Sequence, residues 1–167
     1  PGTTTVTYLA TDLSGNIGSC SFNVVTGIAP NLTITASNLS VCPSNTVSLT
    51  ASGANTYTWS NGISNGIAFT PTATTNYTVN ATSAGGCTAS ATQSIVINPL
   101  PIINVTNPIS CVGGTINLTA SGGSTYLWSG PNSFTSALQN PQIGNAQTTM
   151  SGAYNVTVTT AQGCSSV

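Results

Sequence analysis

The sequence predicts an all-β chain built from small antiparallel β-sandwich domains in tandem. Apolar and polar residues alternate over short segments, as they do in strands with one buried face. Turn-forming pairs such as Ser-Gly, Asn-Gly, Gly-Gly and Asn-Pro separate these segments, and no segment shows helical periodicity with caps. A unit of about 70 residues also occurs twice. Short strands at regular spacing in units of this size are typical of small sandwiches.

The internal repeat is clearest around the two tryptophans. Leu49–Ser60 returns as Leu118–Ser129 with nine of twelve residues identical at an offset of 69, and Cys42 returns as Cys111 at the same offset. The second copy contains eight additional residues, which we expect in the loop region of residues 130–147.

The predicted strands follow in order from the alternation. In the first copy they include residues 47–51, 77–81 and 88–97, and in the second copy residues 116–120 and 154–158. The first 27 residues contain a similar late-strand pattern with a Ser14-Gly15-Asn16 turn. The linkers are expected at Gly27–Pro30 and Asn98–Pro101, because proline stiffens a linker and cannot join a ladder.

Three segments are therefore predicted: the C-terminal part of a unit in 1–27, a complete repeat in 28–100, and in 101–167 a repeat that lacks its last strand. We expect the sequence to be an excerpt of a longer exported protein.

Charge is almost absent from the sequence. Asp12 is the one charged side chain among 167 residues, and Lys, Arg and His do not occur. This excludes nucleic-acid binding, which requires cations against phosphate, and a polybasic membrane surface. No apolar run reaches the roughly 18 residues of a membrane helix, so we expect no membrane insertion. Small polar residues take the place of the charges: 30 Thr, 22 Ser and 18 Asn.

The five cysteines predict an oxidising, extracellular location. No His accompanies them and no CxxC occurs, which argues against a zinc site and favours disulfides. The repeat predicts the pairs Cys42–Cys87 and Cys111–Cys164. Cys20 then has a partner upstream or none.

Two stretches resemble known families. Val6–Asn16 followed by Cys20–Val24 resembles the closing half of a HYR domain. The pattern from Cys42-Pro43 through Tyr57-Thr-Trp59 to Gly86-Cys87 resembles the Ig-like or PKD-like repeats of long cell-surface proteins of Bacteroidota. The resemblance implies immunoglobulin-like sandwiches without catalytic residues, in stalks of adhesins and filaments that are often exported by type IX secretion. It also implies an earlier Cys that pairs with Cys20.

No candidate residue points to catalysis, a cofactor or a metal. A Ser or Cys nucleophile would lack a base. Asp12 alone does not supply the six to eight oxygens of a calcium site, so we expect it to form a turn. Trp59 and Trp128 occupy equivalent positions on a predicted central strand, where core packing is favoured over a sugar-stacking platform.

Glycosylation is a further expectation. Asn-X-Ser/Thr occurs seven times, close to the number that the Ser and Thr content gives by chance; the candidate acceptors are Asn31, Asn38, Asn76, Asn80, Asn104, Asn117 and Asn155. The physical argument is stronger, since strand edges usually carry charges that block association. Here glycans or neighbouring molecules must cover the edges.

The expected function is a structural, non-catalytic repeat segment of an extracellular filament or adhesin stalk that polymerises with copies of itself. One expected contact is a strand exchange in which residues 1–27 of one copy complete the 101–167 unit of the next; arbitrary boundaries in a long chain explain the same ends. The alternatives are a carbohydrate- or protein-binding module on such a stalk and an accessory domain of an enzyme.

Overall fold

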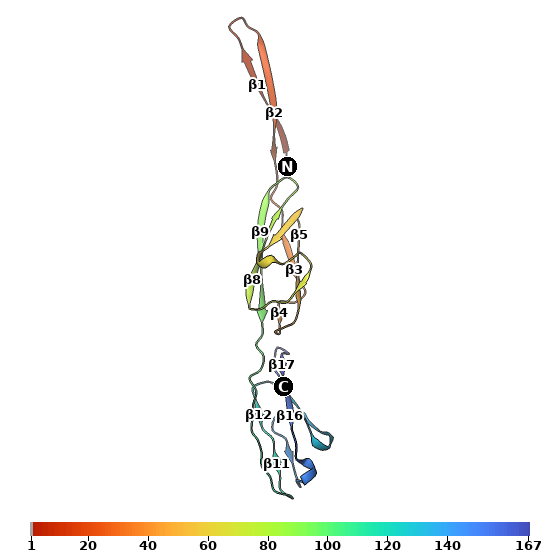
Figure 1. Ribbon diagram of the computed structural model, residues 1–167. Helices are drawn as coiled ribbons and strands as arrows, with labels where there is room; N and C mark the ends of the chain where they lie inside the picture. Colours follow the sequence, from red (N-terminus) through yellow and green to blue (C-terminus); the bar gives the residue numbers. More distant parts are fainter. Residues whose placement is uncertain (1) are drawn as a thin grey trace. The chain divides into compact units, whose positions relative to one another are not determined.

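The computed structural model describes residues 2–167; Pro1, the first residue of the expected 1–27 segment, lies outside the described residues. The predicted all-β fold is confirmed (Figure 1). The described chain consists of strands and three single-turn 3₁₀ helices, without an α-helix. Within residues 2–167, no helix has the length and hydrophobicity to cross a membrane.

The N-terminal segment is a long β-hairpin. Strand β1 (Gly2–Thr11) pairs antiparallel with β2 (Ile17–Thr26) in an unbroken ladder of ten residue pairs. Directly opposite residues share a face, so Val6 and Tyr8 lie on one face with Phe22 and Cys20. The opposite face is rich in Thr, Ser and Asn. This alternation is that of a strand pair from a sandwich, with an apolar face and a polar face.

The first repeat forms two sheets. The three-stranded sheet has the order β3 (Thr33–Ala36), β5 (Val47–Ser52) and β7 (Ala68–Phe69). The four-stranded sheet has the order β4 (Ser40–Val41), β9 (Thr88–Ile97), β8 (Thr75–Thr82) and β6 (Thr56–Trp59), and the 3₁₀ turn η1 (Ser60–Gly62) follows β6. All pairs are antiparallel except β4 with β9, which is parallel.

The second repeat has a related but not identical strand arrangement, with an added strand β14 (Phe134–Ser136) beside β13 (Thr125–Gly130) and, among the described residues, no strand in the place of β4. Two small sheets pair β10 (Asn104–Val105) with β12 (Ala120–Ser121) and β11 (Ile116–Asn117) with β15 (Gln142–Ile143). The four-stranded sheet has the order β14, β13, β16 (Asn155–Thr159) and β17 (Ser165–Ser166). The 3₁₀ turns η2 (Pro131–Ser133) and η3 (Thr148–Met150) complete it. Strand β14 and η2 lie in the region where the eight additional residues are expected.

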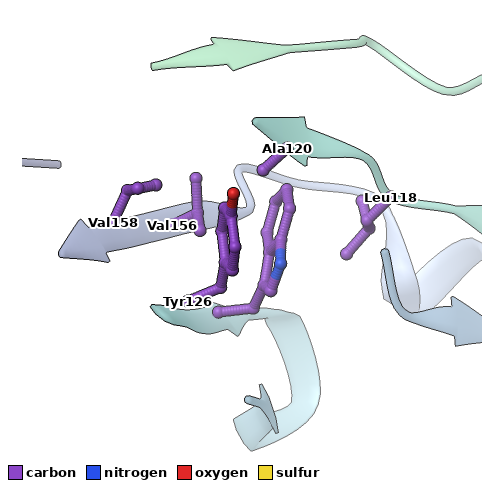
Figure 2. Packing of buried hydrophobic residues seen from close by; sticks show 6 residues of the cluster. Leu118, Ala120, Tyr126, Val156 and Val158 are labelled. Atoms are coloured by element: carbon purple, nitrogen blue, oxygen red, sulfur yellow. The ribbon is translucent and has the colours of Figure 1, made fainter. Parts of the chain in front are cut away.

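Each repeat buries the residues that alternate inward. In the first repeat the core contains Val47, Leu49, Ala51, Trp59, Tyr77, Val79, Ala81 and Ile95. In the second repeat the cluster contains Leu118, Ala120, Tyr126, Trp128, Val156 and Val158. Figure 2 shows Leu118 and Ala120 facing Tyr126 and Val156 across this core. No polar or charged residue is buried among the described residues.

Backbone contacts group the described chain into two compact units. The first comprises the residues up to Leu39 with Thr46–Thr70 and Thr74–Ile95, and the second comprises Ser40–Asn45, Pro71–Ala73 and Val96–Val167. The segment that carries Cys42 therefore belongs to the second unit, although its sequence belongs to the first repeat. The domain boundaries expected at residues 27/28 and 100/101 stay predictions.

Candidate interaction site: the disulfide register and an open sheet edge

Asp12 forms the turn of the N-terminal hairpin. Its Oδ1 accepts hydrogen bonds from the backbone N–H groups of Ser14 (2.8 Å) and Asn16 (2.9 Å), and its Oδ2 accepts one from the Asn16 side-chain amide (2.8 Å). The Asn16 amide, followed by the backbone donors of the turn, holds the pKa of Asp12 below its ordinary value of 3.8. All three interactions serve to close the turn. No group of three or more His, Cys, Asp or Glu residues that could hold a metal lies within residues 2–167.

The structure places both tryptophans in the cores. Trp59 is 6% and Trp128 is 2% exposed, so neither indole face is available for stacking on a sugar. Each indole N–H is satisfied by a loop residue: that of Trp59 donates to Asn65 Oδ1 (3.1 Å), and that of Trp128 donates to the Gln139 carbonyl (3.3 Å).

The loop residues that hold the tryptophans were not among the sequence candidates. Asn65 also accepts from the Ala51 N–H (2.7 Å) and donates to the Ala51 carbonyl (3.1 Å), so one amide fills three hydrogen-bond positions. In the second repeat two residues divide these roles, because Asn140 accepts from the Ala120 N–H (3.2 Å) and Gln139 donates to the Ala120 carbonyl (2.8 Å). The inserted residues before this loop shift its register, which hides the equivalence in the sequence.

The repeated Ser-Gly…Thr-Tyr pattern forms a tyrosine-anchored turn. The hydroxyl of Tyr57 donates to the Ala54 carbonyl (2.8 Å), and that of Tyr126 donates to the Gly123 carbonyl (3.0 Å). The glycine before each turn has a positive φ, +100° at Gly53 and +114° at Gly122. A Cβ at Gly122 would collide with the Ile102 carbonyl oxygen, so both conformation and space require glycine.

The expected disulfide pairs, Cys42–Cys87 and Cys111–Cys164, are wrong in this structure. Cys42 is bonded to Cys164, with a Cα–Cα distance of 5.4 Å and 122 residues between them. Cys20, Cys87 and Cys111 are free thiols. The bond therefore joins the first Cys of one sequence repeat to the second Cys of the next.

Strand geometry explains why the two cysteines of one repeat do not meet. Cys42 directly follows β4, whose Val41 pairs with Ile97 at the end of β9. Cys87 precedes the start of β9. A strand rises about 3.3 Å per residue, so the ten residues from Cys87 to Ile97 span about 33 Å. Disulfide Cα atoms lie about 4.4–6.8 Å apart, so this pair is excluded.

Asn98 lies beside both partners of the bond that does form. Its backbone N–H donates to the Val41 carbonyl (2.8 Å), and its side-chain amide donates to Ser40 Oγ (3.0 Å), which fixes the segment that leads to Cys42. The Asn98 carbonyl oxygen lies 3.8 Å from Cys164 Sγ. Cys164 itself is 1% exposed, so the bond is shielded from solvent on that side.

The remaining candidate residues lie at the surface. All seven sequon asparagines are exposed: Asn31, Asn38, Asn76, Asn80, Asn104, Asn117 and Asn155. Exposure makes each of them accessible to a glycosylating enzyme, and their modification stays a prediction.

Within residues 2–167, the four-stranded sheet of the second repeat has a partly unpaired edge along β16. Strand β8 pairs with β9 along Thr75–Thr82, whereas β16 pairs with β17 at Val158 and Thr159 alone. In the first repeat, Ile95 of β9 is fully buried. The second repeat also has a cleft whose lining includes Ile109, Leu118, Trp128 and Tyr154, the residue directly before β16.

The N-terminal hairpin is likewise incompletely covered. Within the described residues β2 pairs with β1 alone. On its apolar face Tyr8 is 61% and Phe22 is 50% exposed, and their rings stack with centroids 5.9 Å apart. An apolar strand face and an unpaired edge on one hairpin are the features of a strand pair that binds another sheet.

Comparisons with known proteins agree with the hairpin. The HYR domain family model matches residues 1–26, and this family is an extracellular, Ig-like family of adhesion type without catalytic activity. No curated protein matches the chain. Among solved structures, the chain is similar to one in the crystal structure of a mouse coronavirus receptor-binding domain complexed with its murine receptor. The identity is 16%, the TM-score is 0.36, and the match covers 78% of this chain and 93% of that chain. Residues 1–26 thus match a HYR domain, and the disulfide is consistent with the oxidising, extracellular setting of that family.

Proposed function

We propose that this chain is a structural repeat segment of an extracellular filament or adhesin stalk, without catalytic activity. The observation that carries the proposal is an exposed β surface with a single charged side chain, Asp12. Soluble β proteins protect strand edges with charges. A surface without that protection associates with other strands unless something covers it, and in a stalk or filament the neighbouring subunits do so.

The edge of the hairpin and the edge of the second repeat are proposed to complement each other. The hairpin offers an unpaired β2 edge and an apolar face, and the second repeat offers the β16 edge with the adjoining cleft. We propose that residues 1–27 of one copy add to the 101–167 unit of the next copy. Backbone hydrogen bonds would give the affinity, and apolar side chains entering the cleft would set the register.

Glycans are the second proposed cover. The seven exposed sequons lie on both repeats, and one of them is Asn155, the first residue of β16. A glycan on Asn155 would lie beside the open edge and oppose strand addition there. The intact mass of the native exported protein tests whether any of the seven asparagines carries a sugar.

One observation favours a second function, a carbohydrate- or protein-binding module on a stalk. The stacked rings of Tyr8 and Phe22 form an exposed aromatic pair. The two tryptophans, which are the stronger sugar-binding candidates by residue type, are buried and favour the structural role.

Assembly of the purified, oxidised chain tests the proposal. We expect sedimentation velocity and electron microscopy to show linear polymers whose abundance is nearly equal in 0.05 and 0.5 M NaCl, because no ion pairs hold them together. Phe22→Lys places a charge on the apolar face of the hairpin and should abolish assembly. Ser21→Lys adds the same charge to the polar face and serves as the matched control. A monomer that binds a glycan or protein ligand through Tyr8 and Phe22 would establish the binding module instead.

A further inference from the structure

The disulfide defines a rule for the cysteines of the repeat. Each repeat carries a first Cys (Cys42, Cys111) and a second Cys (Cys87, Cys164). The bond that forms joins the first Cys of one repeat to the second Cys of the following repeat. Under this rule Cys111 would bond to the second Cys of a following repeat, and Cys87 to the first Cys of a preceding one; both are free thiols among the described residues.

Cys87 lies in the same local structure as the bonded Cys164. Both occupy the last position of a tight turn closed by equivalent hydrogen bonds: the Ser83 N–H donates to the Cys87 carbonyl (2.8 Å), and the Thr160 N–H donates to the Cys164 carbonyl (2.9 Å). The side-chain hydroxyls of Ser83 and Thr160 also accept from the N–H groups of Cys87 and Cys164, both at 3.2 Å.

The neighbour of the Cys87 sulfur also matches. Cys164 Sγ lies against Asn98, the residue directly after β9. Cys87 Sγ lies against Gly27, the residue directly after β2. The two are so close that a Cβ added to Gly27 would lie 2.5 Å from the sulfur. Gly27 and Asn98 thus follow the long closing strands of consecutive units. In the bonded case, Cys42 reaches this position from β4, which pairs with the end of β9. A strand in the same place on the end of β2 would bring a first Cys to Cys87.

Cys111 resembles the bonded Cys42 in the same way. The Gly114 N–H donates to the Cys111 carbonyl (2.9 Å), as the Asn45 N–H donates to the Cys42 carbonyl (3.2 Å). Cys111 is exposed, and it follows the segment Val105–Ser110, which lines the cleft of the second repeat together with Tyr154, the residue directly before β16. Its thiol is therefore accessible at the place where an added strand would lie.

We propose that Cys87 and Cys111 are the open ends of a disulfide ladder, in which each first Cys bonds to the second Cys of the next repeat. The partner of each thiol is the complementary cysteine of another repeat of this kind, in a second copy of this chain or elsewhere in one polypeptide. The proposal deepens the structural function and rests on it, since a stalk or filament places such repeats end to end. Cys20 is outside the ladder, because it lies within β2 on the apolar face of the hairpin rather than in a Gly-Cys turn.

Formation of each bond requires a disulfide as oxidant. A thiolate attacks the oxidant and displaces one thiol, and the second cysteine then attacks the mixed disulfide and displaces the other. Two Cys thiols thus become one Cys–Cys disulfide, and the oxidant is reduced to two thiols. Oxidised glutathione supplies this chemistry in the test below.

The experiment uses the 167-residue chain with Cys20→Ser, treated with oxidised glutathione at pH 8. The remaining thiols are blocked with an alkylating agent before thermolysin digestion, which separates the Cys87 and Cys111 peptides by cutting before Ile95, Val96 and Ile97. Mass spectrometry then identifies the linked peptides. We expect Cys42–Cys164 within each chain, together with multimers linked by Cys87–Cys111 that are seen on non-reducing gels and disappear on reduction. Cys87→Ser and Cys111→Ser should each remove these multimers and leave Cys42–Cys164 intact.

The same map of the native exported protein distinguishes the two sources. A Cys87–Cys111 link between copies identifies a second copy as the partner, and a link from Cys87 to a cysteine outside residues 1–167 identifies another repeat in one polypeptide; either result supports the ladder. Links Cys42–Cys87 and Cys111–Cys164, or Cys87 and Cys111 both alkylated in the native protein, would overturn it. Disulfide-linked multimers that persist unchanged in Cys87→Ser and Cys111→Ser would refute the ladder, whereas polymers seen by sedimentation in the same variants would leave the proposed filament function in place.

Discussion

Asn65 is the residue whose removal tests the structure of the first repeat most sharply. Asn65→Ala deletes three hydrogen bonds at once, to the Trp59 indole and to both backbone groups of Ala51. A typical hydrogen bond contributes about 1 kcal/mol, and partners left unpaired away from water add to the loss. We therefore expect the free energy of unfolding of this repeat to fall by about 3 kcal/mol.

The second repeat provides an internal comparison for the same change. Asn140→Ala removes one hydrogen bond, to the Ala120 N–H, because Gln139 supplies the others. The expected loss is about 1 kcal/mol. Asn38→Ala is the surface control, since Asn38 is exposed, and its expected loss is below about 0.5 kcal/mol.

Urea unfolding followed by tryptophan fluorescence resolves the two repeats, because each contains one tryptophan. Trp128→Phe leaves Trp59 as the reporter for Asn65→Ala, and Trp59→Phe leaves Trp128 as the reporter for Asn140→Ala. With a urea m-value of about 1 kcal/mol/M, the midpoint should fall by about 3 M for Asn65→Ala and about 1 M for Asn140→Ala. Equal shifts for the two variants, or an Asn65→Ala shift no larger than that of Asn38→Ala, would refute the assignment of three bonds to Asn65.

Three further predictions concern the core, a turn and pH. Trp128→Ala empties the centre of the second core and should cost about 3–5 kcal/mol in chemical denaturation, whereas the adjacent, exposed Leu127→Ala should cost below about 0.5 kcal/mol; similar losses would contradict the core assignment. Gly163→Ala should lower the free energy of unfolding by about 1–2 kcal/mol because of the positive φ alone. Gly122→Ala should lower it at least twice as much, because its Cβ would also collide with the Ile102 carbonyl oxygen. Thermal unfolding of both variants tests this order, and a larger loss for Gly163→Ala would contradict the structure. The pKa of Asp12 is lowered by the turn, so its contribution to stability is present above pH 3.8 and is lost as pH falls further. Burial raises the pKa of Tyr77 above 10.0, so stability also falls as pH rises past 10. The melting temperature should show both declines. The decline at low pH should be absent in Asp12→Asn, and the decline at high pH should be absent in Tyr77→Phe.

The strands and cores were predictable because alternation depends on local sequence alone. Val47, Leu49 and Ala51 alternate with polar residues, and each is buried. Side chains of a strand point alternately to its two faces, so every second residue lies on the same face. The buried residues can therefore be predicted without knowing which strand pairs with this one. The same argument placed Val156 and Val158 in the second core.

The disulfide was not predictable from the repeat alone. The repeat identifies equivalent cysteines, and the simplest assumption pairs them within a unit. The length of β9 contradicts this assumption, because a ten-residue strand separates the two cysteine positions of the first repeat. A bond between successive repeats depends on a contact between segments 122 residues apart, which no local pattern encodes. The long alternating stretch at residues 88–97 contained the signal that could have excluded Cys42–Cys87.

The roles of Asn65 and of the Gln139-Asn140 pair were also outside the reach of sequence reasoning. Asn next to Gly normally indicates a turn, and Asn65-Gly66 follows that rule. The hydrogen bonds to Trp59 and Ala51 depend on how the loop folds over the core. Such contacts depend on the tertiary structure. The equivalent tryptophan and alanine groups are therefore hydrogen-bonded by Asn65 in one repeat and by Gln139 and Asn140 in the other.

Sedimentation of the native protein, combined with its intact mass, tests the central proposal most directly. A β surface with almost no charge should be found covered, so we expect polymers, attached glycan, or both. A dispersed, sugar-free monomer at physiological concentration would contradict the proposal, because its strand edges would then remain soluble without charge, sugar or neighbour.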